Sequence, residues 1–296
     1  MDDADEERGA DAREGTSTTG SGVDAAVLDD VARALADART AVAFTGAGVS
    51  TASGIPSFRG ANGVWGDTFD PADFDRSRLG RDPAGFWRDR VALHDHMYAA
   101  DPEPNAAHEA LAAMERAGHL DAVVTQNTDG LHRAAGSTTV ELHGNGSRVV
   151  CERCGERAPA GPARETARAG DLPRCACGGL QRPDVVLFGE GLPDDAFERA
   201  QSLAVRAGAF LAVGSSLTVD PAATLPRLAA RTGTLVVVNL DPTPLDSLAD
   251  HVLRADVVEV LPAVAARLDA GNADGDAGGD VDEDGNVDGG VDEEAG

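Results

Sequence analysis

The sequence predicts an α/β fold in which helices cover a parallel sheet and a smaller lobe is inserted. Three observations predict it. Short uncharged apolar runs alternate with segments of helical periodicity, and each run ends in small or polar residues. Two close cysteine pairs interrupt this alternation in a glycine- and proline-rich stretch. With 296 residues, of which 42% are hydrophobic, the chain is long enough to bury the core that such a fold needs.

The first predicted strand, residues 41–44, leads directly into the segment TGAGVSTASGIPSFRG. Gly46 and Gly48 lack a Cβ atom, so the N–H groups of this strand-to-helix turn can face a pyrophosphate. Thr51 stands where the third glycine of the G-x-G-x-x-G fingerprint would be, so the match to that fingerprint is incomplete. A tight turn without a ligand explains the two glycines equally well. By itself, the segment is only a candidate dinucleotide site.

Four later apolar runs end in the same way, and each is expected to be a strand of the same sheet. Ligands of open α/β sheets bind outside the carboxyl ends of the strands, so these endings outline one crevice. A polar residue after one strand is usually loop chemistry, but five such endings together favour a binding site. The runs are 122–125, 139–142, 210–213 and 235–238, followed by Gln126 to Asp129, His143 and Gly144, Gly214 to Ser216, and Asn239 to Asp241.

Three segments show apolar residues at helical spacing and are expected to cover the sheet. They are residues 27–36, 106–117 and 196–207. Between residues 60 and 105 the pattern is irregular, with glycine, proline and aspartate around several aromatic residues. We expect a partly helical insertion there, with Phe69 and Phe74 in its core.

The four cysteines form two close pairs, Cys151-x-x-Cys154 and Cys175-x-Cys177. Four thiolates in a tetrahedral set suit Zn²⁺, and disulfides, the alternative, are rare in a cytosolic setting. Because the protein would supply all four ligands, no coordination position remains for water or substrate. The segment between the pairs has few periodic apolar residues, so a metal would supply folding energy there. The sequence therefore predicts one structural zinc ion and disfavours a catalytic one.

The formal net charge is −26, and all 25 basic residues are Arg because the sequence contains no Lys. Residues 1–24 carry −6 and residues 269–296 carry −11, which leaves −9 on residues 25–268. Both end segments lack apolar periodicity and are predicted to be disordered acidic tails. This composition is typical of a salt-adapted, halophilic organism, where screening makes self-repulsion tolerable. It disfavours direct nucleic-acid binding by the core.

Membrane insertion and secretion are not expected from the sequence. No segment approaches the roughly 18 apolar residues of a membrane span. The first residues are acidic, whereas a signal peptide begins with basic and then apolar residues. We expect a cytoplasmic protein without a membrane partner.

Seven motifs, taken together, resemble the sirtuin (Sir2-like) family of NAD-dependent protein deacylases, its archaeal members in particular. In order, they are GAGVSTASGIPSFRG, TQNTDGLHRAAG, ELHG, the four-cysteine module, RPDVVLFGE, GSSL and VNLD, and the likeness spans residues 27–266. It implies a catalytic domain over residues 25–268 with a Rossmann-like large domain. The smaller lobe would consist of a helical, cofactor-loop insertion at about 60–105 and a zinc-ribbon module at about 149–183, both read from the motif positions.

The resemblance implies transfer of an acyl group from lysine to ADP-ribose, with NAD consumed as co-substrate and nicotinamide released. Acyl-lysine proteins or peptides would be the partners. His143 of ELHG is implied as the general base, since a strand-end histidine with an ordinary pKa of about 6.5 can accept a proton near neutrality. Asn127 would hold the nicotinamide end. The implied NAD contacts are Gly46, Ala47, Gly48, Phe58, Arg59, Trp65, Gln126, Asn127, Asp129, His143, Gly214, Ser215, Ser216, Asn239, Leu240, Asp241 and Val257.

For the acyl-lysine substrate, the resemblance implies contacts with Val185, Phe188 and Gly189. Some sirtuins recognise acidic acyl groups through a Tyr-x-x-Arg pair, which corresponds here to Trp87 and Arg90. Arg90 can clamp a carboxylate, whereas Trp87 offers only an indole N–H and the neighbouring Asp89 can neutralise the arginine instead. We predict a deacetylase with some tolerance for succinyl or malonyl groups.

Three positions depart from the family pattern. Ser57 stands where many members carry Asp, Thr128 replaces Ile or Val, and the second cysteine pair is C-x-C. The hydroxyl of Thr128 would face nicotinamide from a wall expected to be apolar.

Two other functions remain open, an NAD-dependent protein ADP-ribosyltransferase and a non-catalytic NAD-binding sensor, although a sensor is expected to lack His143 or Asn127. Of the remaining histidines, solvent-facing positions are expected for His94, His96, His108 and His119.

Overall fold

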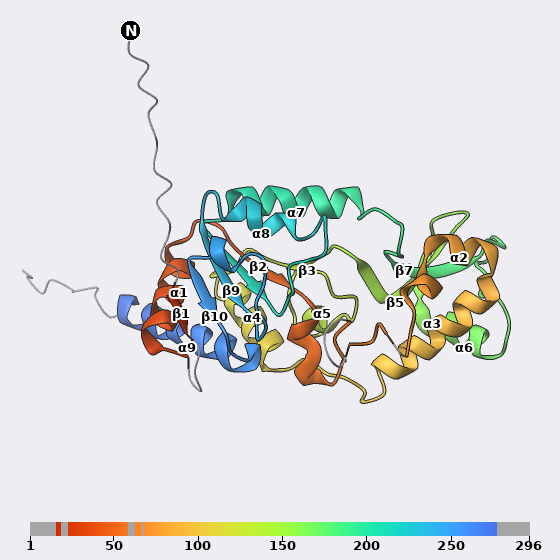
Figure 1. The fold of residues 1–296 in the computed structure, drawn as a ribbon, viewed down its shortest axis with the longest axis horizontal. Coiled ribbons are helices and arrows are strands. Elements are labelled where there is room, and N and C mark those ends of the chain that lie inside the picture. Colours follow the sequence, from red (N-terminus) through yellow and green to blue (C-terminus); the bar gives the residue numbers. More distant parts are fainter. Residues whose placement is uncertain (1–15, 19–22, 59–62, 67, 277–296) are drawn as a thin grey trace, which may run out of the picture.

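Seven parallel strands form the main sheet of the computed structural model, which describes residues 16–18, 23–58, 63–66 and 68–276. The strand order is β1-β10-β9-β8-β2-β3-β4, so β2 lies between β8 and β3 (Figure 1). The α/β fold with a parallel sheet is thereby confirmed. The strands are β1 (Thr16–Thr18), β2 (Ala41–Thr45), β3 (Ala122–Thr125), β4 (Thr139–Glu141), β8 (Ala209–Val213), β9 (Thr234–Val238) and β10 (His251–Leu253).

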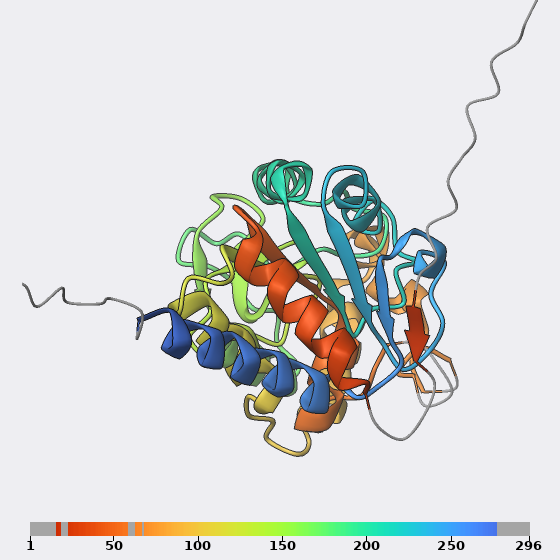
Figure 2. The same ribbon diagram turned by 90° about the vertical axis from the view of Figure 1, so that its left-hand side faces the viewer.

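Helices cover both faces of this sheet, as Figure 2 shows. Every residue of β2 and β8 is buried, which explains why these strands read as continuous apolar runs. On one face lie α1 (Ala25–Asp37), α4 (Ala106–Arg116) and α9 (Val257–Asp276), and on the other α7 (Asp194–Arg206) and α8 (Thr224–Ala229). The three helices predicted from periodicity are α1, α4 and α7.

The smaller lobe has its own antiparallel sheet in the order β6-β5-β7. Its strands are β5 (Gly144–Cys151), β6 (Arg157–Pro159) and β7 (Gln181–Val185), and its helices are α2 (Arg76–Arg81), α3 (Pro83–Met97) and α6 (Ala160–Arg168). Short elements complete the chain: η1 (Ala47–Ser53), η2 (Pro71–Phe74), α5 (Leu131–Ala134) and η3 (Asp246–Leu248). The lobe therefore combines residues from two separate stretches of sequence.

Helix α3 was not predicted as a regular helix, because its apolar residues serve two cores. Phe86 and Trp87 pack in the small-lobe core, whereas Leu93 and Met97 pack with Phe74 in a second cluster. A helix that faces two cores shows no single apolar stripe. The predicted core position of Phe74 is correct, and Phe69 packs half-buried against the same cluster.

The predicted end segments differ from the structure in two places. Thr16–Thr18, inside the predicted N-terminal tail, form the edge strand β1, which pairs with β10. Helix α9 continues past residue 268 to Asp276. The other tail residues, 1–15, 19–22 and 277–296, lie outside the described residues. None of the described helices is long and apolar enough to cross a membrane.

Candidate active site

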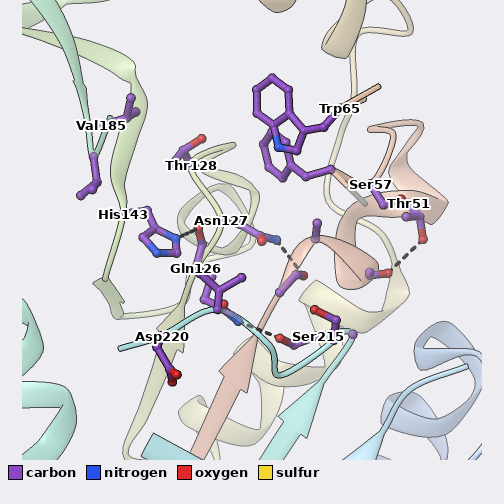
Figure 3. A pocket seen from close by; sticks show the side chains of 18 of the residues that line it. Thr51, Ser57, Trp65, Gln126, Asn127, Thr128, His143, Val185, Ser215 and Asp220 are labelled. Atoms are coloured by element: carbon purple, nitrogen blue, oxygen red, sulfur yellow. Dashed lines mark hydrogen bonds between the residues drawn. The ribbon is translucent and has the colours of Figure 1, made fainter. Parts of the chain in front are cut away.

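One cavity of about 630 Å³ lies between the carboxyl ends of the large-sheet strands and the smaller lobe. The cavity lies at the end of β2, which pairs with β3 on one side and with β8 on the other. Open α/β sheets bind ligands at such a position. The cavity is lined by nineteen of the predicted site residues: Gly46, Ala47, Gly48, Phe58, Trp65, Arg90, Gln126, Asn127, His143, Val185, Phe188, Gly189, Gly214, Ser215, Ser216, Asn239, Leu240, Asp241 and Val257. Figure 3 labels Trp65, Gln126, Asn127, His143, Val185 and Ser215 among them.

Glycines bring the two central loops into backbone contact at the floor of this cavity. The N–H of Gly48 donates to the carbonyl of Gly214 at 2.8 Å, and a Cβ atom on Gly48 would lie 2.7 Å from that oxygen. Gly214 itself has φ +57°, which favours glycine. The glycines after β2 thus have a packing role as well as the predicted role of leaving backbone N–H groups open to a phosphate.

The ring of His143 is held in one tautomer. Its Nδ1 lies 2.7 Å from the carbonyl oxygen of Gln126, which only accepts, so Nδ1 carries the proton in the neutral ring. Nε2 then carries the lone pair. Gln126 is fixed in turn, because its side-chain amide donates to Ser215 Oγ at 2.9 Å. The imidazole is therefore oriented as a proton acceptor at the cavity wall (Figure 3).

Asn127 is buried and held by two hydrogen bonds from its side-chain amide. Nδ2 donates to the carbonyl of Gly46 and to Ser50 Oγ, at 3.1 Å in each case. Ser50 Oγ in turn donates to Asp129 Oδ2 at 2.8 Å. The glycine turn and the loop after β3 are thus joined by one network, in which Ser50 is the central residue.

His108 belongs to this network, and the prediction that it faces solvent is wrong. Its side chain is fully buried, since the helix α4 that carries it packs onto the sheet. Nδ1 accepts from the backbone N–H of Asn105 at 3.3 Å, and Nε2 lies 3.4 Å from Ser50 Oγ. Its ring also lies against that of His132, with centroids 4.7 Å apart. Of the other three histidines that were expected to face solvent, His96 is exposed, and His94 and His119 are half-buried.

These two histidines should make stability fall on mild acidification. Burial lowers the pKa of His108 to about 4 and that of His132 to about 3, below the ordinary value of about 6.5 that applies to the unfolded chain. Between pH 6.5 and 4 the unfolded chain therefore binds more protons, and the free energy of unfolding decreases as the pH falls. We expect thermal unfolding of the His108→Gln variant to depend less on pH in this window than that of the parent. His96→Gln, at an exposed position, is the control, and equal pH dependence in parent and His108→Gln would contradict the assignment.

Aromatic side chains form one wall of the cavity. Phe58 stacks on Trp65 with ring centroids 5.4 Å apart, and Phe188 meets Trp65 edge-on at 5.6 Å. Phe188 is 38% exposed, which is unusual for a phenylalanine and leaves its ring open to a ligand. At the opposite end, Leu240 is 66% exposed beside Asn239 and Asp241.

Two residues predicted to contact NAD or the acyl group, Trp87 and Asp129, do not line the cavity. Trp87 is 2% exposed in the small-lobe core, and its indole N–H donates to the carbonyl of Gln181 at 3.0 Å. The prediction that Trp87 contacts the acyl group is therefore wrong, because its side chain is buried and its only polar group is already bonded to Gln181. Asp129 lies behind Asn127, bonded to Ser50 and to the N–H of Leu131. Arg59 lies outside the described residues.

Several residues of the site were not predicted from the sequence. Ser50 and His108 support it from behind, and nothing in a single sequence distinguishes them from loop or core residues. Val219, Asp220 and Pro221 line the cavity shortly after the GSSL motif, and Asp256 lines it just before α9 begins at Val257. Ser216 could be predicted because it closely follows a predicted strand, whereas these four residues do not. Thr128, noted as a departure from the family, does line the cavity (Figure 3).

The four cysteines lie at one end of the small-lobe sheet, as predicted for zinc. Their Sγ atoms all lie within 4.8 Å of one another, with 3.5 Å between Cys151 and Cys177 and 3.7 Å between Cys154 and Cys175. A tetrahedron with Zn–S bonds of about 2.3 Å has edges of about 3.7 Å, so the donor set fits Zn²⁺. The site lies outside the group of residues that line the cavity, as a structural role requires.

Comparisons with known proteins agree on one family. The Sir2 family model matches residues 46–221. The NAD-dependent protein deacetylase of Haloarcula marismortui is 62% identical over 251 residues, covering 83% of this chain and 96% of that protein. The NAD-dependent protein deacylase of Thermococcus kodakarensis is 45% identical, covering 82% and 96%.

Solved structures of similar fold contain the expected ligands. A Sir2 complex with p53 peptide and NAD⁺ has a TM-score of 0.73 at 38% identity, covering 83% of this chain and 99% of that one. A Sir2 complex with deacetylated p53 peptide and 3′-O-acetyl ADP-ribose has a TM-score of 0.74 at 39% identity, covering 81% and 97%.

Proposed function

The chain belongs to the Sir2 family, and from this premise we propose that it is an NAD-dependent protein-lysine deacylase. It transfers the acyl group from lysine to ADP-ribose and releases nicotinamide. The observation that carries the proposal is the oriented imidazole of His143, in the same cavity as Asn127 and the glycine turn. The relatives named as deacetylases and deacylases support it.

The cavity offers each part of NAD a suitable surface. The pyrophosphate would lie on the turn at Gly46 to Gly48, with Ser215 and Ser216 close by. Asn239 and Asp241 would meet the adenosine ribose, where a carboxylate accepts hydroxyl hydrogen bonds. The nicotinamide end would lie against Asn127, and Phe58 with Trp65 would shield the reactive ribose from water.

The reaction proceeds in two stages. In the first, the acyl-lysine carbonyl oxygen attacks the anomeric carbon, the C–N bond to nicotinamide breaks, and nicotinamide leaves. In the second, His143 Nε2 takes the proton of a ribose hydroxyl, whose oxygen attacks the imidate carbon. Water finally releases free lysine and acyl-ADP-ribose. Only the second stage needs His143, so labelled nicotinamide can return to NAD by reversal of the first stage alone.

Mass spectrometry tests the assignment against the two alternatives. The parent protein with NAD and an acetyl-lysine peptide is expected to give nicotinamide, deacetylated peptide and acyl-ADP-ribose. ADP-ribosylated protein without deacetylation would instead indicate an ADP-ribosyltransferase, and binding of NAD without any turnover would indicate a sensor. The product complex seen in a relative supports deacylation over both.

We further propose that Arg90 gives the site tolerance for acidic acyl groups. Arg90 lines the cavity, and none of the described carboxylates forms an ion pair with it. Asp89 is engaged elsewhere, with Arg78 at 3.2 Å and Arg88 at 3.1 Å. Because Trp87 is used in the core, Arg90 alone would recognise the distal carboxylate of a succinyl group.

Arg90→Met is expected to abolish succinyl-peptide turnover while acetyl-peptide turnover changes little, because methionine keeps the apolar stem but not the charge. The measurement is kcat/KM for both peptides. Arg88→Met is the matched control, since Arg88 lies on the same helix with its side chain 72% exposed. Undetectable succinyl turnover in the parent, or equal succinyl turnover in parent and Arg90→Met, would show that Arg90 takes no part in acyl recognition.

For its setting, we propose a cytoplasmic protein that acts on acyl-lysine proteins without binding nucleic acid or membrane. Four thiols arranged around a common centre support a reducing compartment, where metal binding prevails over disulfides. The net charge of −26 opposes binding to nucleic acid.

A further inference from the structure

The chain passes from the large sheet to the smaller lobe over the four residues from Glu141 to Gly144, which include His143. Glu141 is the last residue of β4, and β5 begins at Gly144. On the small-lobe side, the N–H of Val186 donates to the carbonyl of His143 at 3.0 Å. Gly144 has φ +76°, and a Cβ atom there would lie 2.2 Å from the carbonyl oxygen of Asp184. The backbone at His143 and Gly144 is therefore in close contact with β7 and with Val186, the residue that follows it.

Regular pairing between β5 and β7 is interrupted in the next part of this crossing. Gly144 pairs with Val185, but the register shifts before it resumes at Val149 and Pro183. Arg148 lies within this interruption, and its backbone pairs with Pro159 of β6 instead. A side-chain contact from Arg148 to β7 therefore adds a restraint that the β5–β7 ladder does not supply at this point.

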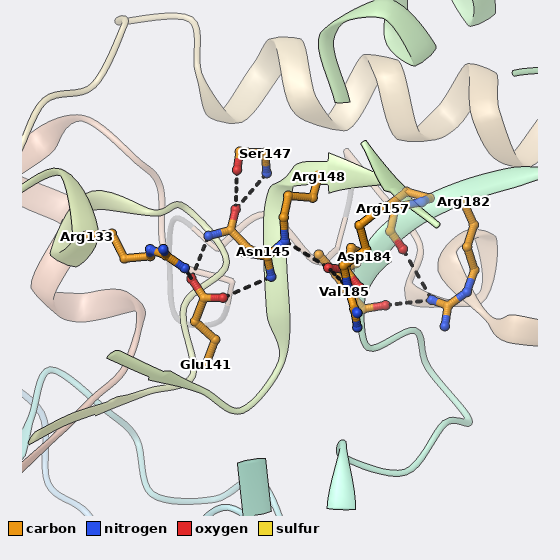
Figure 4. A network of polar contacts seen from close by, with 10 residues as sticks. Arg133, Glu141, Asn145, Ser147, Arg148, Arg157, Arg182, Asp184 and Val185 are labelled. Carbon is orange, nitrogen blue, oxygen red and sulfur yellow. Dashed lines mark hydrogen bonds and ion pairs between the residues drawn. The ribbon is translucent and has the colours of Figure 1, made fainter. Parts of the chain in front are cut away.

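Arg148 supplies it by joining carboxylates from both lobes (Figure 4). Its Nη2 lies 3.0 Å from Glu141 Oε2 at the end of the large sheet, and its Nε lies 2.9 Å from Asp184 Oδ2 on β7. Both carboxylate side chains are only 13% exposed, so salt screens these pairs less than surface pairs. Glu141 Oε1 also accepts from Asn145 Nδ2, two residues beyond His143.

The guanidinium stays charged in this setting. Burial lowers the pKa of Arg148, but the hydrogen bonds that it donates to Asp184 and Glu141 and the charges of these carboxylates outweigh burial and hold the pKa above the ordinary value. Two further arginines approach the same carboxylates from outside: Arg157 lies 3.0 Å from Asp184, and Arg133 lies 3.9 Å from Glu141. Neither of them contacts both carboxylates, so among the described residues Arg148 is the one arginine that joins Glu141 to Asp184.

We propose that Arg148 is a positioning residue that sets His143 against the acyl-lysine side of the cavity by clamping Glu141 to Asp184. Asp184 directly precedes Val185, which lines the cavity and pairs with Gly144, the residue after His143. The clamp thus fixes the distance between the proton acceptor and the wall at which the substrate is expected. The inference rests on the proposed deacylase function.

The two stages of the reaction separate this role from a merely structural one. Nicotinamide exchange needs NAD and acyl peptide bound between aligned lobes but does not need His143. Arg148→Met should therefore lower deacylation by on the order of ten- to a hundred-fold, the cost of misplacing a catalytic group by about 1 Å, while exchange stays within about threefold. Arg157→Met is the matched control, since it removes an arginine from the same Asp184 without touching Glu141, and it should leave both rates near those of the parent.

Glu141→Gln provides a second variant in case Arg148→Met does not fold. It keeps an acceptor for Asn145 but removes the charge that Arg148 meets, and the same change in the ratio of deacylation to exchange is expected. A proportional fall of both reactions, or no change in either, would overturn the clamp. Absence of both reactions in the parent would instead refute the proposed function.

Discussion

Replacing His143 with alanine is expected to abolish peptide deacylation while NAD binding stays close to that of the parent. General-base assistance is typically worth about 10² to 10⁴ in rate, and no other described histidine lines the cavity. NAD affinity should persist because the glycine turn, Ser215 and Asn239 do not depend on the imidazole. Calorimetry with NAD and turnover of acetyl peptide are the two measurements. Nicotinamide exchange should also survive, since it precedes proton transfer to His143.

The control is His96→Ala, because His96 lies exposed on α3 and outside the residues that line the cavity. A His143→Ala protein that turns over acetyl peptide within a few-fold of the parent would show that His143 is not the general base. Loss of NAD binding together with turnover would point to a collapsed cavity, so the unfolding temperature of each variant should be compared with that of the parent.

Much of this site was predictable because parallel strands end at the same edge of their sheet. Once residues 41–44, 122–125, 210–213 and 235–238 were recognised as strands, the residues after them had to converge. The apolar runs are readable because both faces of β2 and β8 are covered by helices, so no polar residue interrupts them. The site and the fold thus follow from the same feature of the sequence.

The missed residues act through contacts that have no local signature. His108 lies on a helix among charged residues, yet it is buried because α4 packs onto the sheet at the place where Ser50 needs a donor. Trp87 was misplaced for the opposite reason. A likeness to a substrate-binding pair put it in the cavity, whereas packing with Phe86 and Leu79 buries it in the small-lobe core. Spacing along the chain does not reveal which of two cores a side chain joins.

Strand β5 carries both Arg148 and one of the four cysteines. Cys151 closes the strand that begins beside His143, and Arg148 lies between them. The order of the small lobe therefore reaches the cavity through β5 and through its partner β7, which carries Val185 and leads to Phe188. Loss of order at the cysteines should accordingly be felt in catalysis as well as in folding.

Each chain is expected to bind one Zn²⁺ through Cys151, Cys154, Cys175 and Cys177, and Cys151→Ala should lose the metal, the small-lobe fold and activity together. Structural zinc sites of comparable size supply about 10 to 16 kcal/mol of apparent binding free energy at neutral pH, more than the whole stability of most domains. The small lobe is poorly placed to compensate, because few large apolar side chains form its core. Elemental analysis, limited proteolysis and peptide turnover of the full chain are the measurements.

Val149→Ala is the matched control for that variant. Val149 is buried on the same strand, and its truncation leaves all four thiols in place, so zinc should stay stoichiometric while stability falls by about 1 to 3 kcal/mol. Chelation of the parent should reproduce the Cys151→Ala behaviour, and added zinc should reverse it. Because the thiols lie apart from the cavity, the lost activity must pass through the fold of the lobe. A parent protein without stoichiometric zinc, or with full turnover after its metal is stripped, would be incompatible with a structural role.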